Sequence, residues 1–355
     1  MNKETLAFGA ALIGLLVHNS ASAHTDVPVI ADTGATVASE DGSKLTGVMP
    51  LDEQFSLAPA APASDLTVPS EALASFASEN GGGGAPTAAP LGVGGAIQAR
   101  RPYGFSTYAE QTGKVGWQVL AVTAAITATR FKDFTSEGSK FYHRNEGFFG
   151  RNTKSLGMDK MHHAWKSYVL TDVLQSIIEN KTGDRKGAAY TSAILGFGIM
   201  AYAEVLDGYT ARTGFSREDV AVHAFGSAVS LVRNVVPGMR DKLDFRMEAN
   251  PFNSGGGLNL VNQLSRRKYL FATQLSGFRK LESSPLRFAE IHVGYAGRGF
   301  TPEERLRGEP LKRKIFFGLG LNVQKLFARK PKSKIERYAK GVFDYYQPPY
   351  TAIRN

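Results

Sequence analysis

The sequence contains no cysteine. This absence excludes disulfides, cysteine-ligated zinc, thiol nucleophiles and a lipid attached through a cysteine, so we expect a protein that is not lipidated. The absence of cysteine is still compatible with a location in an oxidising compartment, because such a compartment permits disulfides without requiring them. The sequence also lacks a nucleophile elbow, a phosphate-binding loop and an RNA-binding motif. We therefore expect no nucleic-acid partner, and the sequence names no cofactor.

Bulky apolar residues are sparse over most of the first 100 positions. An apolar run at 6–17 is too short to span a bilayer, and it is followed by a small-x-small cleavage pattern at 21–23. We therefore predict a signal peptide over residues 1–23 and export from the cytoplasm. Residues 24–100 are rich in Ala, Pro, Ser, Thr and Gly. Such a segment cannot bury enough apolar surface to offset its chain entropy, so we predict a disordered linker.

Charge is distributed unevenly along the chain. The first 100 residues carry 3 Lys and Arg against 10 Asp and Glu, a net charge of −7, so the overall +10 leaves +17 for residues 101–355. Residues 251–355 hold 20 basic and 7 acidic side chains, a net charge of +13. A basic domain favours an anionic partner, and for an exported protein we expect an anionic lipid or lipopolysaccharide surface. A basic surface that is merely solvated is the alternative, and no protein partner is indicated.

Apolar stretches between residues 101 and 247 predict a helical domain. Glycines or a Pro-Gly pair bound most of these stretches, which cover residues 117–130, 159–179, 187–206 and 216–236. The third stretch just reaches the length of a membrane span, but small and polar residues fill much of it. We therefore favour a helix buried among other helices, or lying at a membrane surface, over a true span.

The pattern changes in the region 248–355, which we predict to be basic and rich in strands. Apolar residues alternate at 315–323, with the period of two that is typical of a strand. Further strands are expected at 269–275 and 286–295, with a charged connecting loop at 297–314. We predict an α+β fold, in which a bundle of about four helices precedes a small antiparallel β region that packs on it.

Three polar clusters interrupt the apolar helical stretches. They consist of Asp159, Lys160 and His163; of Glu204, Asp207 and Gly208; and of Ser216 and Asp219. Burying ionisable groups costs several kcal/mol unless they are paired or bound to something. Because the clusters fall at the ends of adjoining helical segments, we expect them to form one shared site.

Several of these residues also suit a purely structural role. Asp159 stands where a helix takes an acid in its first turn. Ser216 and Asp219 form a start that resembles a capping box. Asp207 could assist a helix C-cap at Gly208.

Glu204 does not fit such a role. It lies near the C-terminal end of the most apolar stretch, where the helix dipole disfavours an anion. We therefore expect a cation beside it, supplied by Lys160, Arg212 or a protonated His163.

A converging set of this kind allows three roles, of which we favour the first. It can be a hydrogen-bonded latch that fixes helix packing. It can perform acid–base chemistry, with His163 as general base, Asp159 orienting it, and Glu204 and Asp219 as acid or electrostatic partners. It can also hold a divalent metal through His163, Glu204 and His223.

Motifs in both halves of the chain carry a family resemblance. They are Glu146-Gly147-Phe148-Phe149-Gly150, Asp159-Lys160-x-x-His163, Glu204-x-x-Asp207-Gly208, Gly214-Phe215-Ser216-x-x-Asp219, and the segments 243–246, 293–295, 319–322 and 347–350. Over residues 115–355 this combination resembles the predicted periplasmic lipoproteins of unknown function of Gram-negative bacteria. The helical part is also distantly similar to VanZ-type membrane proteins, although His223 stands where the pattern has Asn.

The resemblance and the composition together imply an exported protein of the cell envelope. We expect a structural or interaction role at the periplasmic face of the outer membrane. The first alternative is an enzyme that acts on a lipid or an envelope glycan. The second is an envelope protein that binds a divalent metal.

Overall fold

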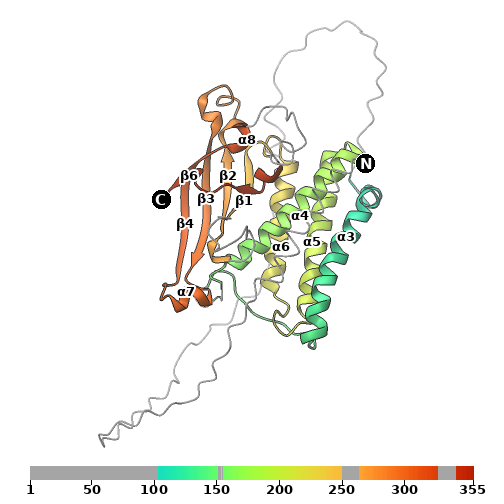
Figure 1. Cartoon of the computed structure of the whole chain (residues 1–355). Coiled ribbons are helices and arrows are strands. Elements are labelled where there is room, and N and C mark those ends of the chain that lie inside the picture. The colour runs from blue at the N-terminus through green and yellow to red at the C-terminus, as the bar shows by residue number, and fades with distance from the viewer. Residues whose placement is uncertain (1–102, 151–152, 154, 250–263, 327–340) are drawn as a thin grey trace, which may run out of the picture. The chain divides into compact units, whose positions relative to one another are not determined.

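The computed structural model describes residues 103–355 except for 151–152, 154, 250–263 and 327–340. The predicted signal peptide and linker lie outside the described residues. The described part has the predicted α+β fold, with four long helices followed by a mixed sheet of six strands (Figure 1).

The four long helices start and end close to the positions predicted, with one exception. They are α3 (Phe105–Glu137), α4 (Met158–Thr182), α5 (Arg185–Asp207) and α6 (Arg217–Val235). The prediction for α3 was too short, because no proline interrupts the sequence on either side of its apolar middle. Capping fixes the ends of the others: Gly183 ends α4 in a left-handed conformation, and the Ser216 hydroxyl accepts a hydrogen bond from the Asp219 amide.

Helix α4 is buried on two sides. One side packs in an apolar core with α3 and α5, where Leu174 and Ile178 meet Val122 and Ile199. The opposite side packs in a second core with α6 and the sheet, in which Trp165 takes part. This double burial explains why α4 shows no clear polar face in the sequence.

Helix α5 packs against the three other long helices. It is the one helix in the described ranges that is long and apolar enough to cross a membrane, and 44% of the window that meets this test is buried. Gly196 allows a close approach to α4, since a Cβ there would lie 2.2 Å from the Thr171 hydroxyl oxygen. Helix α5 therefore packs as one member of the group formed by α3, α4, α5 and α6.

The sheet has the strand order β5-β1-β2-β3-β4-β6. Its members are β1 (Leu243–Glu248), β2 (Lys268–Gln274), β3 (Ala289–Arg298), β4 (Lys312–Leu321), β5 (Tyr346–Gln347) and β6 (Ala352–Arg354). The neighbours from β1 to β4 and the β4–β6 pair are antiparallel, as predicted, but β5 runs parallel to β1.

Three details of the β region differ from the prediction. Strand β1 lies on both sides of the boundary drawn after residue 247. The strand predicted at 286–295 starts at Ala289, because Pro285 begins a short 3-10 turn. The predicted loop at 297–314 contains the ends of β3 and β4, joined through the short helix α7 (Pro302–Leu306).

Candidate functional site

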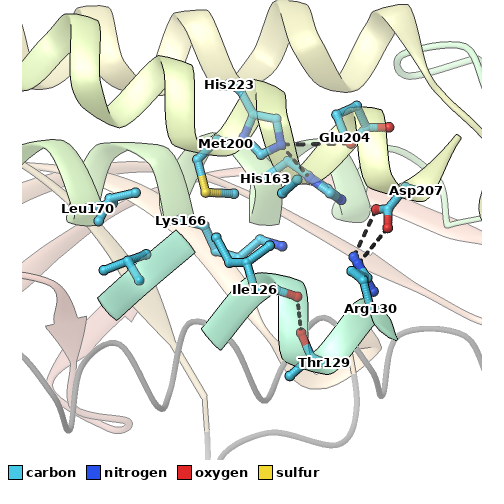
Figure 2. Close-up of a pocket in the computed structure, with 12 residues that line it drawn as sticks. Ile126, Thr129, Arg130, His163, Lys166, Leu170, Met200, Glu204, Asp207 and His223 are labelled. Atoms are coloured by element: carbon cyan, nitrogen blue, oxygen red, sulfur yellow. Dashed lines mark hydrogen bonds and ion pairs between the residues drawn. The ribbon is translucent and has the colours of Figure 1, made fainter. Parts of the chain in front are cut away.

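The three polar clusters lie together where α4 and α6 begin and α5 ends. The Lys160 ammonium nitrogen lies 2.8 Å from an Asp219 oxygen and so joins α4 to α6. The rings of His163 and His223 join the same two helices, and Glu204 reaches His223 from α5. Figure 2 shows the part of the site around His163, Glu204 and His223, whose side chains come from three separate helices.

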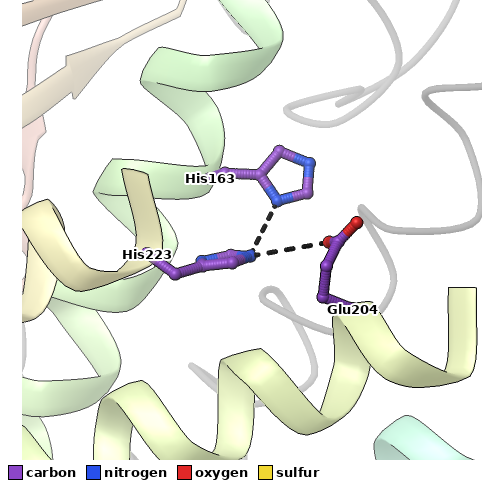
Figure 3. A group of neighbouring side chains, drawn as sticks. All are labelled: His163, Glu204 and His223. Carbon is purple, nitrogen blue, oxygen red and sulfur yellow. Dashed lines mark hydrogen bonds and ion pairs between the residues drawn. The ribbon is translucent and has the colours of Figure 1, made fainter. Parts of the chain in front are cut away.

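The centre of the site is a group of two imidazoles and one carboxylate (Figure 3). His163 Nδ1 lies 3.0 Å from His223 Nε2, and the ring planes make an angle of 70°. His223 Nε2 lies 4.0 Å from Glu204 Oε2. The other oxygen of Glu204 accepts a hydrogen bond from the Ser216 backbone amide at 3.0 Å. We call His163, Glu204 and His223 the His-His-Glu group.

Each imidazole also has a partner on its outer nitrogen. His163 Nε2 lies 3.4 Å from Asp159 Oδ1, and at 4.0 Å it also faces Asp219. His223 Nδ1 lies 2.7 Å from the hydroxyl oxygen of Ser167, which is fully buried. These contacts fix the ring orientations and leave His163 Nδ1 and His223 Nε2 facing each other.

Burial and neighbouring charge shift the acidity of the group. Burial raises the pKa of Glu204 to about 8, although the nearby His163 opposes this. Burial and the charge of His163 hold the pKa of His223 well below its usual range. Burial alone would lower the pKa of His163, but Asp219 and Asp159 outweigh it and raise the value. Among the cations expected beside Glu204, the one that acts on it is therefore the protonated imidazole of His163 and not Lys160.

Lys160 instead neutralises a separate set of carboxylates. Its buried ammonium donates hydrogen bonds to Glu146 at 2.6 Å and to both oxygens of Asp219 at 2.8 and 2.9 Å, and it lies 3.6 Å from Asp159. Although burial opposes it, these carboxylates raise the pKa of Lys160. The ion pairs tie the segment before α4 to α4 and α6.

The carboxylate of Asp207 takes part in an ion pair that the sequence did not indicate. Gly208 follows α5 with right-handed backbone angles, and its own amide bonds to the Glu204 carbonyl. The Asp207 carboxylate forms a two-point ion pair with Arg130, with Nη2 at 2.8 Å and Nε at 2.6 Å. This pair joins α5 to α3, because a buried carboxylate needs a matching cation more than a helix end needs a side-chain cap.

Sequence reasoning missed four residues of the site. Ser167 follows His163 by four positions on one helix, a spacing that could have revealed it. Glu146 is part of a motif that was noted but not given a role. Arg130 and Lys166 are both buried. In the sequence, a single basic residue beside apolar ones is only a weak sign of a buried functional cation.

A pocket lies beside the His-His-Glu group. One side of its lining is apolar and includes Ile126, Leu170 and Met200. The other side holds the His-His-Glu group together with Arg130, Lys166 and Asp207. Burial and the charge of Arg130 lower the pKa of Lys166. The arrangement gives the group access to a space that a water molecule or a ligand group could enter.

The family comparison falls on the segment that builds this site. Residues 145–235 match the family described as "Predicted periplasmic lipoprotein (DUF2279)". This segment contains the three polar clusters and His223, and it confirms the family resemblance carried by the motifs. Residues 145–235 are therefore similar to a family of predicted periplasmic proteins of unknown function, in agreement with the expected export. No curated protein and no solved structure matches the chain.

The family description names a lipoprotein, but the sequence has no cysteine that could carry the lipid. The similarity to VanZ-type proteins stays a prediction.

Proposed function

We propose that the helical domain binds one divalent transition-metal ion through the His-His-Glu group. The observation that carries this proposal is the convergence of one ligand atom each from His163, Glu204 and His223, all within 4.8 Å of one another. The ligands come from three different helices, α4, α5 and α6. Imidazole and carboxylate ligands suit zinc and related ions.

The spacing of the ligand atoms supports a tetrahedral ion. Bond lengths of about 2.0–2.1 Å place neighbouring ligands roughly 3.3 Å apart. The distances of 3.0 Å between the two imidazole nitrogens and 4.0 Å between His223 and Glu204 lie on either side of this value. Small rotations of the side chains would equalise them.

The outer contacts of the two histidines support the same proposal. Histidines that bind metals usually donate their second ring N–H to a carboxylate, a carbonyl or water, which fixes the tautomer. Asp159 takes this position for His163, and the Ser167 hydroxyl takes it for His223. The two remaining nitrogens, His163 Nδ1 and His223 Nε2, face each other, and His223 Nε2 also lies 4.0 Å from Glu204.

A second combination of ligands is less suitable. Asp159, His163 and Asp219 also lie within 4.8 Å of one another. However, the Lys160 ammonium already binds both oxygens of Asp219 and lies 3.6 Å from Asp159. We therefore assign Lys160 and its carboxylates the structural role of a latch, as we do the pair of Arg130 and Asp207.

Elemental analysis of the full chain, purified without chelators, tests the proposal. We expect about one zinc-class ion per chain, and its loss in Glu204→Gln and in His223→Asn. His143→Asn changes an exposed histidine outside the group and should leave the metal content unchanged. Circular dichroism of each variant checks that the helices remain. A preparation without stoichiometric metal that also fails to take up added zinc would refute the proposal.

The pocket favours a second candidate function, metal-assisted hydrolysis. Three protein ligands would leave a fourth position for water, and the pocket is lined by all three of these residues. Lys166 would attract an anionic substrate such as a lipid or an envelope glycan. Hydrolysis of chromogenic esters or phosphodiesters that is lost in Glu204→Gln would support it. Inactivity of the metal-loaded chain on every substrate would leave metal binding alone.

We further propose that the protein acts at the periplasmic face of the outer membrane. The periplasmic family and the basic C-terminal region support this location. Fractionation of cells that express the chain should recover it with outer membranes, and recovery with the soluble periplasm at low salt would contradict the proposal.

A further inference from the structure

The exposed face of the sheet is apolar over three neighbouring strands. Leu319 of β4 is 65% exposed, Phe317 is 57% exposed, and Ile353 of β6 is 85% exposed. The strand register sets Leu319 between Ile291 and Ile353, and it pairs Phe317 with Val293. The side chains therefore form a continuous surface, which we call the apolar sheet face; its members are Ile291, Val293, Ile315, Phe317, Leu319, Leu321 and Ile353.

The opposite face of the same sheet is polar and buried. Arg246 of β1 donates hydrogen bonds to Asp244 at 2.5 Å and to Glu290 at 2.9 Å. His292 lies 3.1 Å from Glu290, and both are fully buried. An antiparallel sheet with one wet face usually turns its apolar residues to the core and its polar residues to water. Here the polarity of β3 is reversed, whereas β4 exposes apolar residues on one side and buries Phe316 on the other.

Four basic residues lie at the ends of β3 and β4 that border the apolar sheet face. Arg298 pairs in register with Lys312, and the next residues along β4 are Arg313 and Lys314. All four are exposed, and because side chains alternate along a strand, Arg313 lies on the side of the apolar sheet face and the other three lie on the opposite side. The one acidic residue within β3, β4 and β6 is Glu290, which points to the buried side. The apolar sheet face thus carries the positive charge of Arg313 at this end, and β3, β4 and β6 place no carboxylate on it.

Aromatic residues extend the face beyond the strands. Phe148 and Phe149 are exposed, and the ring of Phe149 packs edge-on against Tyr295 of β3 with ring centres 5.4 Å apart. Arg313 donates a hydrogen bond to the carbonyl of Gly150. The segment before α4 therefore adds apolar surface at the same end as the positive charges.

We propose that the apolar sheet face docks on a leaflet of anionic phospholipid. Leu319, Phe317 and Ile353 would enter the acyl region, and Arg313 at the end of the same face would contact headgroup phosphates. A leaflet supplies both apolar chains and negative charge, whereas a second copy of this chain would bring the same cations and no matching carboxylates on these strands. The inference is independent of the metal site.

Flotation of the purified full chain with vesicles tests this inference. We expect binding to vesicles of phosphatidylglycerol and phosphatidylethanolamine at low salt, and weaker binding to phosphatidylcholine. Phe317→Ser with Leu319→Ser should lower the partition coefficient at least about tenfold. Phe225→Ser, on the exposed side of α6, is the matched control and should bind as the unmodified chain does.

A charge-matched pair of variants tests the position of the cation. Arg313→Gln should weaken binding roughly fivefold. Arg217→Gln removes the same charge from an exposed site on α6 and should have little effect. Melting temperatures close to that of the unmodified chain exclude unfolding as the cause.

Three results would overturn the inference. The first is an absence of binding to anionic vesicles. The second is an equal loss of binding in the two charge-matched variants, which would show that only net charge matters. The third is a concentration-dependent dimer that Phe317→Ser with Leu319→Ser abolishes, which would assign the face to a second copy.

Discussion

At the residue scale, His163 connects two environments. One ring nitrogen faces Asp159 and the other faces His223, so its position depends on both. The partner of a metal-binding histidine raises its basicity and limits its rotation. Asp159 is therefore expected to act through His163 and not as a ligand.

Replacing Asp159 with Asn should weaken zinc binding by about 10–100-fold while the fold persists. The amide keeps the shape of the side chain but loses the charge that supports the imidazole. Competition with a chromophoric chelator measures the affinity. Glu303→Gln, an exposed substitution on α7, serves as the control, and equal affinities of the two variants would disprove the positioning role.

Asp344 is expected to make stability depend on pH. Burial and the nearby Asp244 raise its pKa to about 7 from an ordinary value of 3.8. The folded state therefore keeps this proton over a range in which the unfolded chain loses it, so stability falls as the pH rises from about 4 through 7.

Asp344→Asn removes this penalty and retains the acceptor for Gln324. The variant should gain roughly 2 kcal/mol in unfolding free energy at about pH 8, and less at about pH 5. Urea titrations at the two values measure the difference. A gain that does not change with pH would show that Asp344 is ionised in the folded protein.

At the element scale, close contact between α4 and α6 depends on glycine. A Cβ at Gly226 would lie 2.0 Å from the carbonyl oxygen of Ala164 and 3.0 Å from Cβ of Ser167. The first distance cannot be accommodated without moving one helix. The close approach also brings the Ser167 hydroxyl within reach of His223.

Gly226→Ala should destabilise the protein by about 1–3 kcal/mol, because the helices must separate. Gly198→Ala is the matched control on α5, since nothing lies within 4 Å of its Cβ position. There the substitution should stabilise by about 0.5–1 kcal/mol through helix propensity. Urea denaturation compares the two, and a neutral Gly226 variant would contradict the observed packing.

The Lys160 latch also acts between elements, because it joins α4 to α6 and to the segment before α4. Lys160→Met leaves Glu146 and Asp219 without their buried cation and should cost about 3–5 kcal/mol. Lys186→Met, at an exposed position on α5, should change stability little. Thermal and chemical denaturation compare the stabilities of the two variants, and equal stabilities would contradict the latch.

Sequence patterns predicted the elements with strong periodicity best. The ends of α4 and α6 carry Gly and Ser signals that act locally, so they could be read without the fold. Strands β5 and β6 span only a few residues, and no alternation marks strands of that length. Their pairing depends on partners far along the chain.

The candidate site was predictable to a similar degree. Residues in short polar motifs, such as Asp159 and Glu204, could be recognised because they interrupt apolar segments. Arg130 could not be assigned, because its partner Asp207 becomes close only when α3 packs on α5. For the same reason the sequence offered Asp207 a role at the helix C-cap and gave no sign of its ion pair with Arg130.

At the scale of the whole molecule, a metal held by three helices should stabilise the complete helical domain. Zinc at about 100 times its dissociation constant adds roughly 2.7 kcal/mol to the folded state. For a domain of this size the melting temperature should rise by about 5–10 °C. Scanning calorimetry with and without zinc measures this shift, which Glu204→Gln should remove; an equal rise in that variant would assign the effect to other sites.

The segment that begins at Glu146 touches two distant parts of the molecule. Glu146 bonds to Lys160 beside the histidines, while Phe149, three positions later, packs on Tyr295 of the sheet. A rearrangement of these few residues would change the contacts at the histidines and the contacts at the sheet together. If binding of the proposed ion favours one arrangement of this segment, it changes the affinity of the sheet face for lipid. Because binding free energies are reciprocal, lipid then changes the affinity for the ion by the same factor.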